Sequence, residues 1–318
     1  MAIIADLMVQ GAQMLLVLLL APLLTGFVRK VRARLLRRQG PPLFQPYRDL
    51  LRLIRKEVVV ADGASWLFRA APYLIFAAIW VAASFVPTFA IDLIFGWSAD
   101  LIAIVALLGS ARFFLALAGL DVGTSFGGIG ASREMLIAPL AEPAMIMIVY
   151  TLSLLAGSTQ LSFVVAFMSG PDVGLRISVA LSLVALIMVA LAENARMPVD
   201  NPATHLELTM VHEAMVLEYS GRHLAMIEFA ASLKLLLYVS LISAIFLPWG
   251  MAVAGQGIGA YAIGLAVYLA KLGLAGFMLA VFETSIAKMR VFRVSEFLGT
   301  ALMLGLLGTL LLFVSRNL

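Results

Sequence analysis

Phe297-Leu-Gly-Thr-Ala-Leu-Met-Leu-Gly-Leu-Leu-Gly-Thr-Leu-Leu-Leu-Phe-Val-Ser315 is a predominantly apolar segment that contains no charged side chain. A helix of this length measures about 28 Å, close to the thickness of about 30 Å of a bilayer's hydrocarbon core. Because hydrocarbon offers no water to free backbone groups, a segment that crosses it must satisfy its own hydrogen bonds as a helix. The segment therefore predicts a transmembrane helix.

Segments of the same kind recur along the whole chain, which has 318 residues, 63% of them hydrophobic. Charged residues make up only 13% of the chain, against about 25% in a typical soluble domain. We therefore predict an all-α integral membrane protein, a single transmembrane domain over residues 1–318 with about eight transmembrane helices. The spans are expected at roughly 4–28, 70–91, 99–120, 133–157, 177–195, 225–249, 258–283 and 297–315.

Lysine and arginine are distributed unevenly between the segments that connect these spans. Eleven of the 22 lie within 29–69, whereas the opposite side of the membrane is expected to hold only Arg176 and Arg316. Cytoplasmic loops of membrane proteins are enriched in Lys and Arg. This bias predicts two long cytoplasmic loops, 29–69 and 194–224, and both termini on the outer side. The basic residues indicate contact with anionic membrane lipids and not with nucleic acid.

The chain contains no cysteine. Cysteine thiolates hold most iron–sulfur clusters and many zinc ions, so neither is expected in this chain. Any redox centre is expected in a partner subunit or in a cofactor held without cysteine. No metal site is predicted, because His205 and His212 lack the spacing of a zinc motif.

One polar segment directly follows an apolar span. It reads Glu193-Asn-Ala-Arg-Met-Pro-Val-Asp-Asn-Pro-Ala-Thr-His-Leu-Glu-Leu-Thr-Met-Val-His-Glu213 and continues to Gly221. Its ionisable residues alternate with Leu, Met and Val, unlike those of a fully solvated loop. Pro198 and Pro202 interrupt helical structure and leave free backbone groups that can line a cavity. The segment therefore predicts a partly buried polar funnel against the membrane.

Three ordered motifs carry a resemblance to a known family. The first is Glu193-x-x-Arg196-x-Pro198-x-Asp200, followed by Glu207 and by Glu218-Tyr-Ser-Gly221. The others are Gly40-Pro41 with Gln45-Pro46, Asp49 and Lys56-Glu57, and Gly130-Ala-x-Arg133 with Glu142. Together they resemble the membrane subunit 1 family of respiratory complex I over nearly the whole chain. The resemblance implies that the first long loop helps to wall a chamber where a redox module meets the membrane.

Two departures indicate one branch of this family. Complex I subunits usually carry glutamates where this chain has Ala203 and His205, and the stretch from Phe282 to Arg290 resembles the formate-hydrogenlyase type. The chain is thus similar to the membrane-anchor subunit of formate-hydrogenlyase-type, energy-converting membrane-bound nickel–iron hydrogenases. This resemblance disfavours quinone chemistry and leaves a quinone site as an alternative.

Glu142 is the clearest candidate site. Counting about 1.5 Å per residue from a helix start near Arg133 places Glu142 about 13 Å deep, near the middle of the membrane. An isolated ionised carboxylate there costs several kcal/mol, so Glu142 is expected to be neutral or paired. We interpret it as a proton-carrying group; the alternative is a structural acid bonded to a neighbouring helix.

Further ionisable residues lie in apolar spans, among them Arg112, Lys234 and Lys271. The two lysines are expected to relay protons with Glu228 or Glu283. The alternatives are that their long side chains snorkel to the membrane interface or form simple charge pairs with these acids. The predicted proton path comprises Glu142, Glu193, Asp200, Glu207, Glu213, Glu218, Glu228, Lys234, Lys271 and Glu283. The predicted partner-docking residues are Arg38, Gln45, Asp49, Lys56, Glu57, Arg133, Arg196, His205 and Tyr219.

These observations predict a subunit without a redox centre of its own that couples electron transfer in a partner to proton or sodium movement. Expected partners are peripheral hydrogenase-like large and small subunits, an iron–sulfur protein, antiporter-like membrane subunits and membrane lipids. Iron–sulfur clusters are expected in these partners, and a nickel–iron site there is left open. The expected location is the inner membrane of a bacterial or archaeal cell. Alternatives are a quinone-reducing subunit, a stand-alone secondary transporter, and a complex whose soluble module has lost its nickel.

Overall fold

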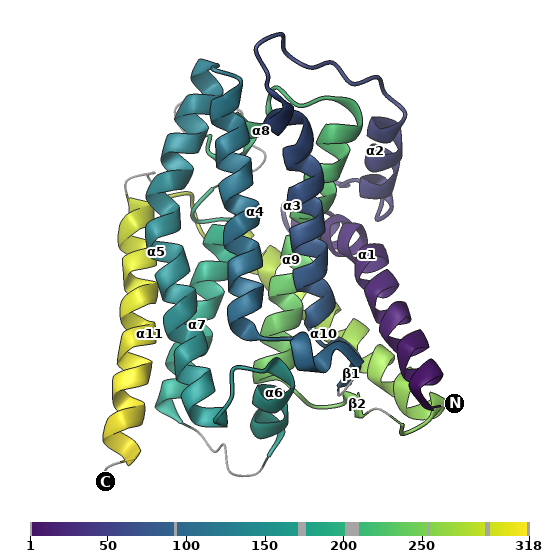
Figure 1. The fold of residues 1–318 in the computed structure, drawn as a ribbon, viewed down its shortest axis with the longest axis vertical. Coiled ribbons are helices and arrows are strands. Elements are labelled where there is room, and N and C mark those ends of the chain that lie inside the picture. Colours follow the sequence, from purple (N-terminus) through teal and green to yellow (C-terminus); the bar gives the residue numbers. More distant parts are fainter. Residues whose placement is uncertain are drawn as a thin grey trace.

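The computed structural model describes residues 2–91, 94–170, 176–200, 210–253, 255–289 and 293–316, which are almost entirely helical (Figure 1). The helices are α1 (Ala2–Leu35), α2 (Gln45–Ile54), α3 (Trp66–Phe85), α4 (Leu101–Asp121), α5 (Ser125–Ala156), α6 (Leu161–Ser169), α7 (Ile177–Glu193), α8 (His212–Val216), α9 (Gly221–Phe246), α10 (Ile258–Ser285) and α11 (Val294–Arg316). A short 3-10 helix, η1 (Ile94–Ser98), and two paired parallel strands, β1 (Ala90–Ile91) and β2 (Ala252–Val253), complete the described elements. The predicted all-α class is confirmed.

Seven of the described helices are long and apolar enough to cross a membrane: α1, α3, α4, α5, α9, α10 and α11. α7 is also apolar but has only 17 residues, a length of about 25 Å. Each of the eight predicted spans therefore coincides with a helix, and the chain is a multi-pass membrane protein. The crossing by α7 and the side on which each terminus lies stay predictions.

The helix that carries Glu142 starts eight residues earlier than the sequence indicated. α5 begins at Ser125 and not near Arg133. Thr124 caps this end, since its hydroxyl accepts a hydrogen bond of 3.3 Å from the backbone N–H of Gly127. The first turns of α5 pack against α4 and α8, and this contact compensates for the low helix propensity of their glycines. Glu142 consequently lies near the midpoint of a 32-residue helix.

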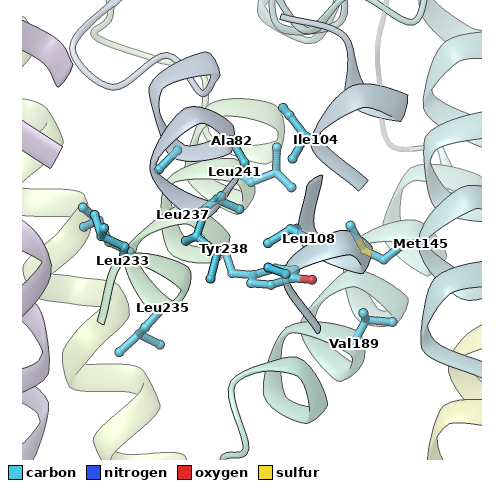
Figure 2. Packing of buried hydrophobic residues seen from close by; sticks show 14 of the residues in the cluster. Ala82, Ile104, Leu108, Met145, Val189, Leu233, Leu235, Leu237, Tyr238 and Leu241 are labelled. Atoms are coloured by element: carbon cyan, nitrogen blue, oxygen red, sulfur yellow. The ribbon is translucent and has the colours of Figure 1, made fainter. Parts of the chain in front are cut away.

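The centre of the bundle is a cluster of closely packed apolar side chains (Figure 2). It joins Ala82 of α3, Leu108 of α4, Met145 of α5, Val189 of α7 and Tyr238 of α9, which are all buried. Helices in a membrane associate mainly through such packing, because the surrounding lipid is as apolar as the side chains. The cluster therefore fixes how these five helices are rotated relative to one another.

The predicted loop 29–69 is partly helical. α1 continues to Leu35, and α2 lies on the flank of the bundle beside α1 and α9 (Figure 1). The chain between α1 and α2 passes so close to Gly26 of α1 that a Cβ atom there would overlap the carbonyl oxygen of Leu43. Only glycine permits this approach without displacement of the backbone.

The substitution Gly26→Ala is expected to destabilise the protein by about 1–3 kcal/mol, because the new methyl group displaces the Leu43 backbone. The matched control is Gly11→Ala on the same helix, where a Cβ atom meets nothing within 4 Å. Thermal unfolding in detergent measures both variants. Equal unfolding temperatures for the two would contradict the close contact.

Candidate functional site

A cavity of about 660 Å³ with many ionisable residues in its lining lies within the helix bundle. Its walls come from α1, α3, α4, α5, α7, α8, α9 and α10. Within the described ranges it is lined by five cations, Arg29, Arg32, Arg112, Arg196 and Lys234, and six carboxylates, Glu134, Glu193, Asp200, Glu213, Glu228 and Glu283. Ionisable side chains inside membrane bundles are costly and usually functional. This cavity is therefore the candidate site.

The cavity begins one helical turn away from the apolar core. Leu108, Val189 and Tyr238 lie in that core (Figure 2). Residues four apart share one face of a helix. The same faces of α4, α7 and α9 therefore carry Arg112, Glu193 and Lys234 into the cavity. Packing in the core thus sets the positions of the charged groups.

Four of these charged residues form one group, here called the central ion cluster: Arg112, Glu134, Glu193 and Lys234. Arg112 Nε lies 2.8 Å from Glu134 Oε1, and Arg112 Nη2 donates to Glu193 Oε1. The second oxygen of Glu193, Oε2, lies 2.8 Å from Lys234 Nζ. The four side chains are at most 17% exposed. The cluster therefore ties α4, α5, α7 and α9 together through buried charges.

Two cations and two carboxylates balance in the central ion cluster. Burial of charge is tolerated only where the partners compensate one another, and loss of one partner typically costs about 3–5 kcal/mol. Arg112 Nη1 is buried and has no hydrogen-bond partner among the described residues. The cavity beside it is lined by further charged groups and is large enough to hold water. The cluster thus borders a space that can hold water.

A second group of charges lies where the segment after α7 meets the end of α10, here called the loop latch: Arg32, Arg196, Asp200, Glu283 and Lys288. Glu283 pairs with Arg196 at 3.1 Å and with Arg32 at 3.5 Å, and Lys288 Nζ lies 2.6 Å from Asp200 Oδ1. Burial lowers the pKa of the Arg196 guanidinium, an effect that Glu283 opposes. The latch therefore holds the first half of the predicted polar funnel against α1 and α10.

Two predicted docking residues, the half-buried Arg133 and the buried Tyr219, have structural contacts within the chain. Arg133 donates from Nη1 to the Met210 carbonyl at 2.6 Å, which anchors the segment before α8. Tyr219 stacks on Phe68 with ring centroids 3.9 Å apart and donates its hydroxyl to the Phe68 carbonyl at 3.0 Å. Burial and the Asp121 carboxylate both raise the pKa of Tyr219, so this hydroxyl keeps its proton.

Of the remaining predicted docking residues, those that the structure describes lie at or near the surface, apart from Arg196 of the loop latch. Gln45 donates to Asp49 at 2.9 Å within α2, and Arg38, Lys56 and Glu57 are exposed. Their role in docking stays a prediction. His205 and the proton-path residue Glu207 lie outside the described residues.

Glu142 lies close to the central ion cluster without belonging to it. A Cβ atom added at Gly109 of α4 would be 3.3 Å from Glu142 Oε1. Gly109 lies three residues before Arg112, on the same helix face, and Arg112 and Glu142 interact electrostatically. Glu142 is half-buried in this chain. Its carboxyl group therefore lies between the cluster and the outer surface of the bundle.

The expected pairing of the two lysines with Glu228 or Glu283 is wrong. Lys234 pairs with Glu193, and Lys271 Nζ donates to the carbonyl oxygens of Leu247 and Trp249, the latter at 2.6 Å. Sequence spacing could not reveal this, because the end of α9 passes the middle of α10. Lys271 thus binds backbone groups that directly follow the end of α9.

Three further acids of the predicted path lie around the cavity or next to it. Glu213 of α8 is half-buried and Glu228 of α9 is exposed, and both line the cavity. Glu218 is half-buried in the turn between α8 and α9. The predicted path does not include Arg112 or Glu134. Arg112 could be found from the sequence because it is a cation within an apolar span. Glu134 could be found because it directly follows Arg133, an arginine of one of the family motifs.

A family model described as NADH dehydrogenase matches residues 9–314 of this chain. The chain therefore belongs to the complex I subunit 1 family, as the sequence motifs indicated. It is similar to formate hydrogenlyase subunit 4 of Escherichia coli (strain K12), with 32% identity over 279 residues that cover 88% of this chain and 90% of that protein. It is also similar to hydrogenase-4 component C of the same strain, with 34% identity over 279 residues, 88% of this chain and 87% of that protein.

The fold has a counterpart among solved structures. A chain in the structure of the membrane-bound sulfane sulfur reductase, an archaeal respiratory membrane complex, matches with a TM-score of 0.78 and 20% identity. The match covers 96% of this chain and 99% of that chain. The bundle described above is therefore a fold that occurs in a respiratory membrane complex.

The central ion cluster generates a prediction about stability. The substitution Glu193→Gln leaves two buried cations, Arg112 and Lys234, with Glu134 as the one remaining carboxylate of the cluster. It is expected to lower the free energy of unfolding by about 3–5 kcal/mol. Adding Lys234→Gln restores the charge balance and should recover part of this loss. Glu228→Gln, at an exposed carboxylate on the same cavity wall, is the control and should unfold close to wild type. Thermal unfolding in detergent measures the three variants. Equal unfolding temperatures for Glu193→Gln and the control would refute the structural role of the cluster.

Proposed function

We propose that this chain is the membrane subunit of an energy-converting redox complex and that it couples electron transfer in a docked module to proton or sodium movement. One observation carries the proposal: ionisable side chains follow one another from the loop latch, across the cavity, to the central ion cluster and Glu142. A bundle that served only as an anchor would not need charges at these positions, given what their burial costs.

Coupling in this proposal is electrostatic. A redox change in the docked module alters the charge near Asp200, Glu213 and Glu218, which lie in or around the predicted funnel. The cavity is lined by five cations and six carboxylates, so a change of charge nearby acts on several ionisable groups at once. The change shifts the proton affinity of Glu193 and, through Arg112, of Glu142. This is linked titration of interacting sites.

The partners follow from the relatives and from the two predicted cytoplasmic loops. The relatives are named as subunits of formate hydrogenlyase and hydrogenase-4. In our proposal a peripheral hydrogenase-like module with iron–sulfur clusters docks on residues 29–69 and 194–224. Antiporter-like membrane subunits lie next to Glu142, a residue that this chain leaves half-buried. The complex is located in the inner membrane of a bacterial or archaeal cell.

A quinone site is the second candidate function, and one observation favours it. The cavity reaches the exposed residues Arg29 of α1 and Glu228 of α9, two helices that pack against each other. Sites for small molecules usually measure about 300–1,000 Å³, and the cavity falls within that range. A quinone headgroup could therefore enter between α1 and α9.

The substitution Glu142→Gln is expected to leave electron transfer in the soluble module near wild type and to reduce the coupled proton movement at least tenfold. The reason is that glutamine keeps the shape of the side chain and cannot carry a proton. The assay measures redox turnover and pH change together in vesicles that contain the whole complex. Glu296→Gln, which removes an exposed carboxylate at the start of α11, is the control. Unchanged coupling in Glu142→Gln would rule out this role.

Isolation of the complex through a tag on this chain separates the two candidates. The proposal expects co-purified subunits that contain iron–sulfur clusters and nickel, with hydrogen production or uptake. Quinone-dependent turnover in a preparation without nickel would move the assignment to the second candidate. Recovery of this chain without any partner would contradict both.

A further inference from the structure

α2 presents an outward face that the rest of the bundle leaves uncovered. Pro46 is its only buried residue. The large apolar side chains of Phe44, Leu51 and Ile54 are 61%, 54% and 56% exposed. Exposure of three such apolar side chains to water, on one ten-residue helix and its cap, is unfavourable, so we expect a partner to cover them.

The exposed residues of α2 form two parallel stripes. Arg48, Arg52 and Arg55 follow at spacings of four and three, so they lie along one line of the helix. Phe44, Leu51 and Ile54 follow at spacings of seven and three and form a second line beside the first. An apolar stripe next to a cationic stripe is typical of a helix that lies in the interface of a membrane.

The position of α2 identifies the surface that this face meets. α2 lies on the outer flank of the molecule, beside α1 and α9 (Figure 1). The Tyr47 hydroxyl donates to the carbonyl oxygen of Leu19. Leu19 belongs to the candidate span Leu7–Leu35, and its side chain and that of Leu15 are 62% and 61% exposed. The apolar stripe of α2 therefore continues the lipid-facing flank of α1.

We propose that the outer face of α2 binds anionic phospholipid headgroups. Arg48, Arg52 and Arg55 contact the phosphates, while Phe44, Leu51 and Ile54 lie among the upper acyl carbons. Asp49 pairs with Arg52 at 3.5 Å, with the two side chains 34% and 67% exposed, and such exposed pairs are weak. The site thus keeps a net positive charge that complements an anionic headgroup.

The first experiment tests the charge. Full-length chain in neutral detergent is titrated with phosphatidylglycerol or phosphatidylcholine, and bound lipid is counted by native mass spectrometry. The variant Arg48→Gln/Arg52→Gln/Arg55→Gln is expected to bind phosphatidylglycerol roughly 100-fold more weakly, at about fivefold per arginine. The control Arg176→Gln/Arg222→Gln/Arg293→Gln removes three exposed arginines that lie outside residues 29–69 and should keep most of the binding. Equal loss in both variants, or no preference for the anionic lipid, overturns the proposal.

The second experiment tests the apolar stripe and uses the absence of cysteine from the chain. A nitroxide is attached to Leu51→Cys, or to Asp62→Cys as an exposed reference, in nanodiscs that contain phosphatidylglycerol. We expect oxygen to accelerate the spin relaxation of the label at position 51 more than a water-soluble nickel complex does. For the label at position 62 we expect the nickel complex to have the larger effect. A label at 51 that behaves like the reference, or that is shielded from both agents by another protein, overturns the proposal.

Discussion

Arg112 can stay charged inside an apolar bundle only because Glu134 and Glu193 lie against its guanidinium. This pairing constrains more than one side chain, since the three residues come from three helices and Lys234 adds a fourth. A rotation of α4, α5, α7 or α9 that separated a pair would leave a buried charge without compensation. The apolar cluster one turn away imposes the same rotations through packing. Charge and shape therefore specify one arrangement of the bundle.

The loop latch extends this constraint to the end of the bundle where α8 lies. Asp200 and Arg196 hold the segment after α7 against Lys288 and Glu283, and both groups of charges face the same cavity. A partner that docks on the outside of this segment therefore lies close to the buried charges on its inner side. Interactions across such a network are screened far less than interactions on the protein surface. This continuity supports the coupling that we propose between the docked module and the bundle.

Much of the fold was predictable from the sequence, because helices that cross a membrane follow from apolar length alone. Glu193, Arg196 and Asp200 were identified by the spacing of their motif, and all three lie at the cavity. The partners of the charged residues were not predictable, since they depend on which helices meet in space. The assignment of Lys271 to an acid failed for this reason. The start of α5 was misplaced because its glycines resemble a loop, and the Thr124 cap was overlooked.

The central ion cluster also limits how this chain can diverge. Its four residues share two charges of each sign, so a single replacement of Glu193 or Lys234 passes through an unfavourable intermediate. Lineages can exchange these residues more readily in pairs, with an acid and a base lost or traded together. Sequences descended from a common ancestor should therefore show correlated substitutions at positions 112, 134, 193 and 234. Charge compensation inside the bundle thus predicts which positions change together during evolution.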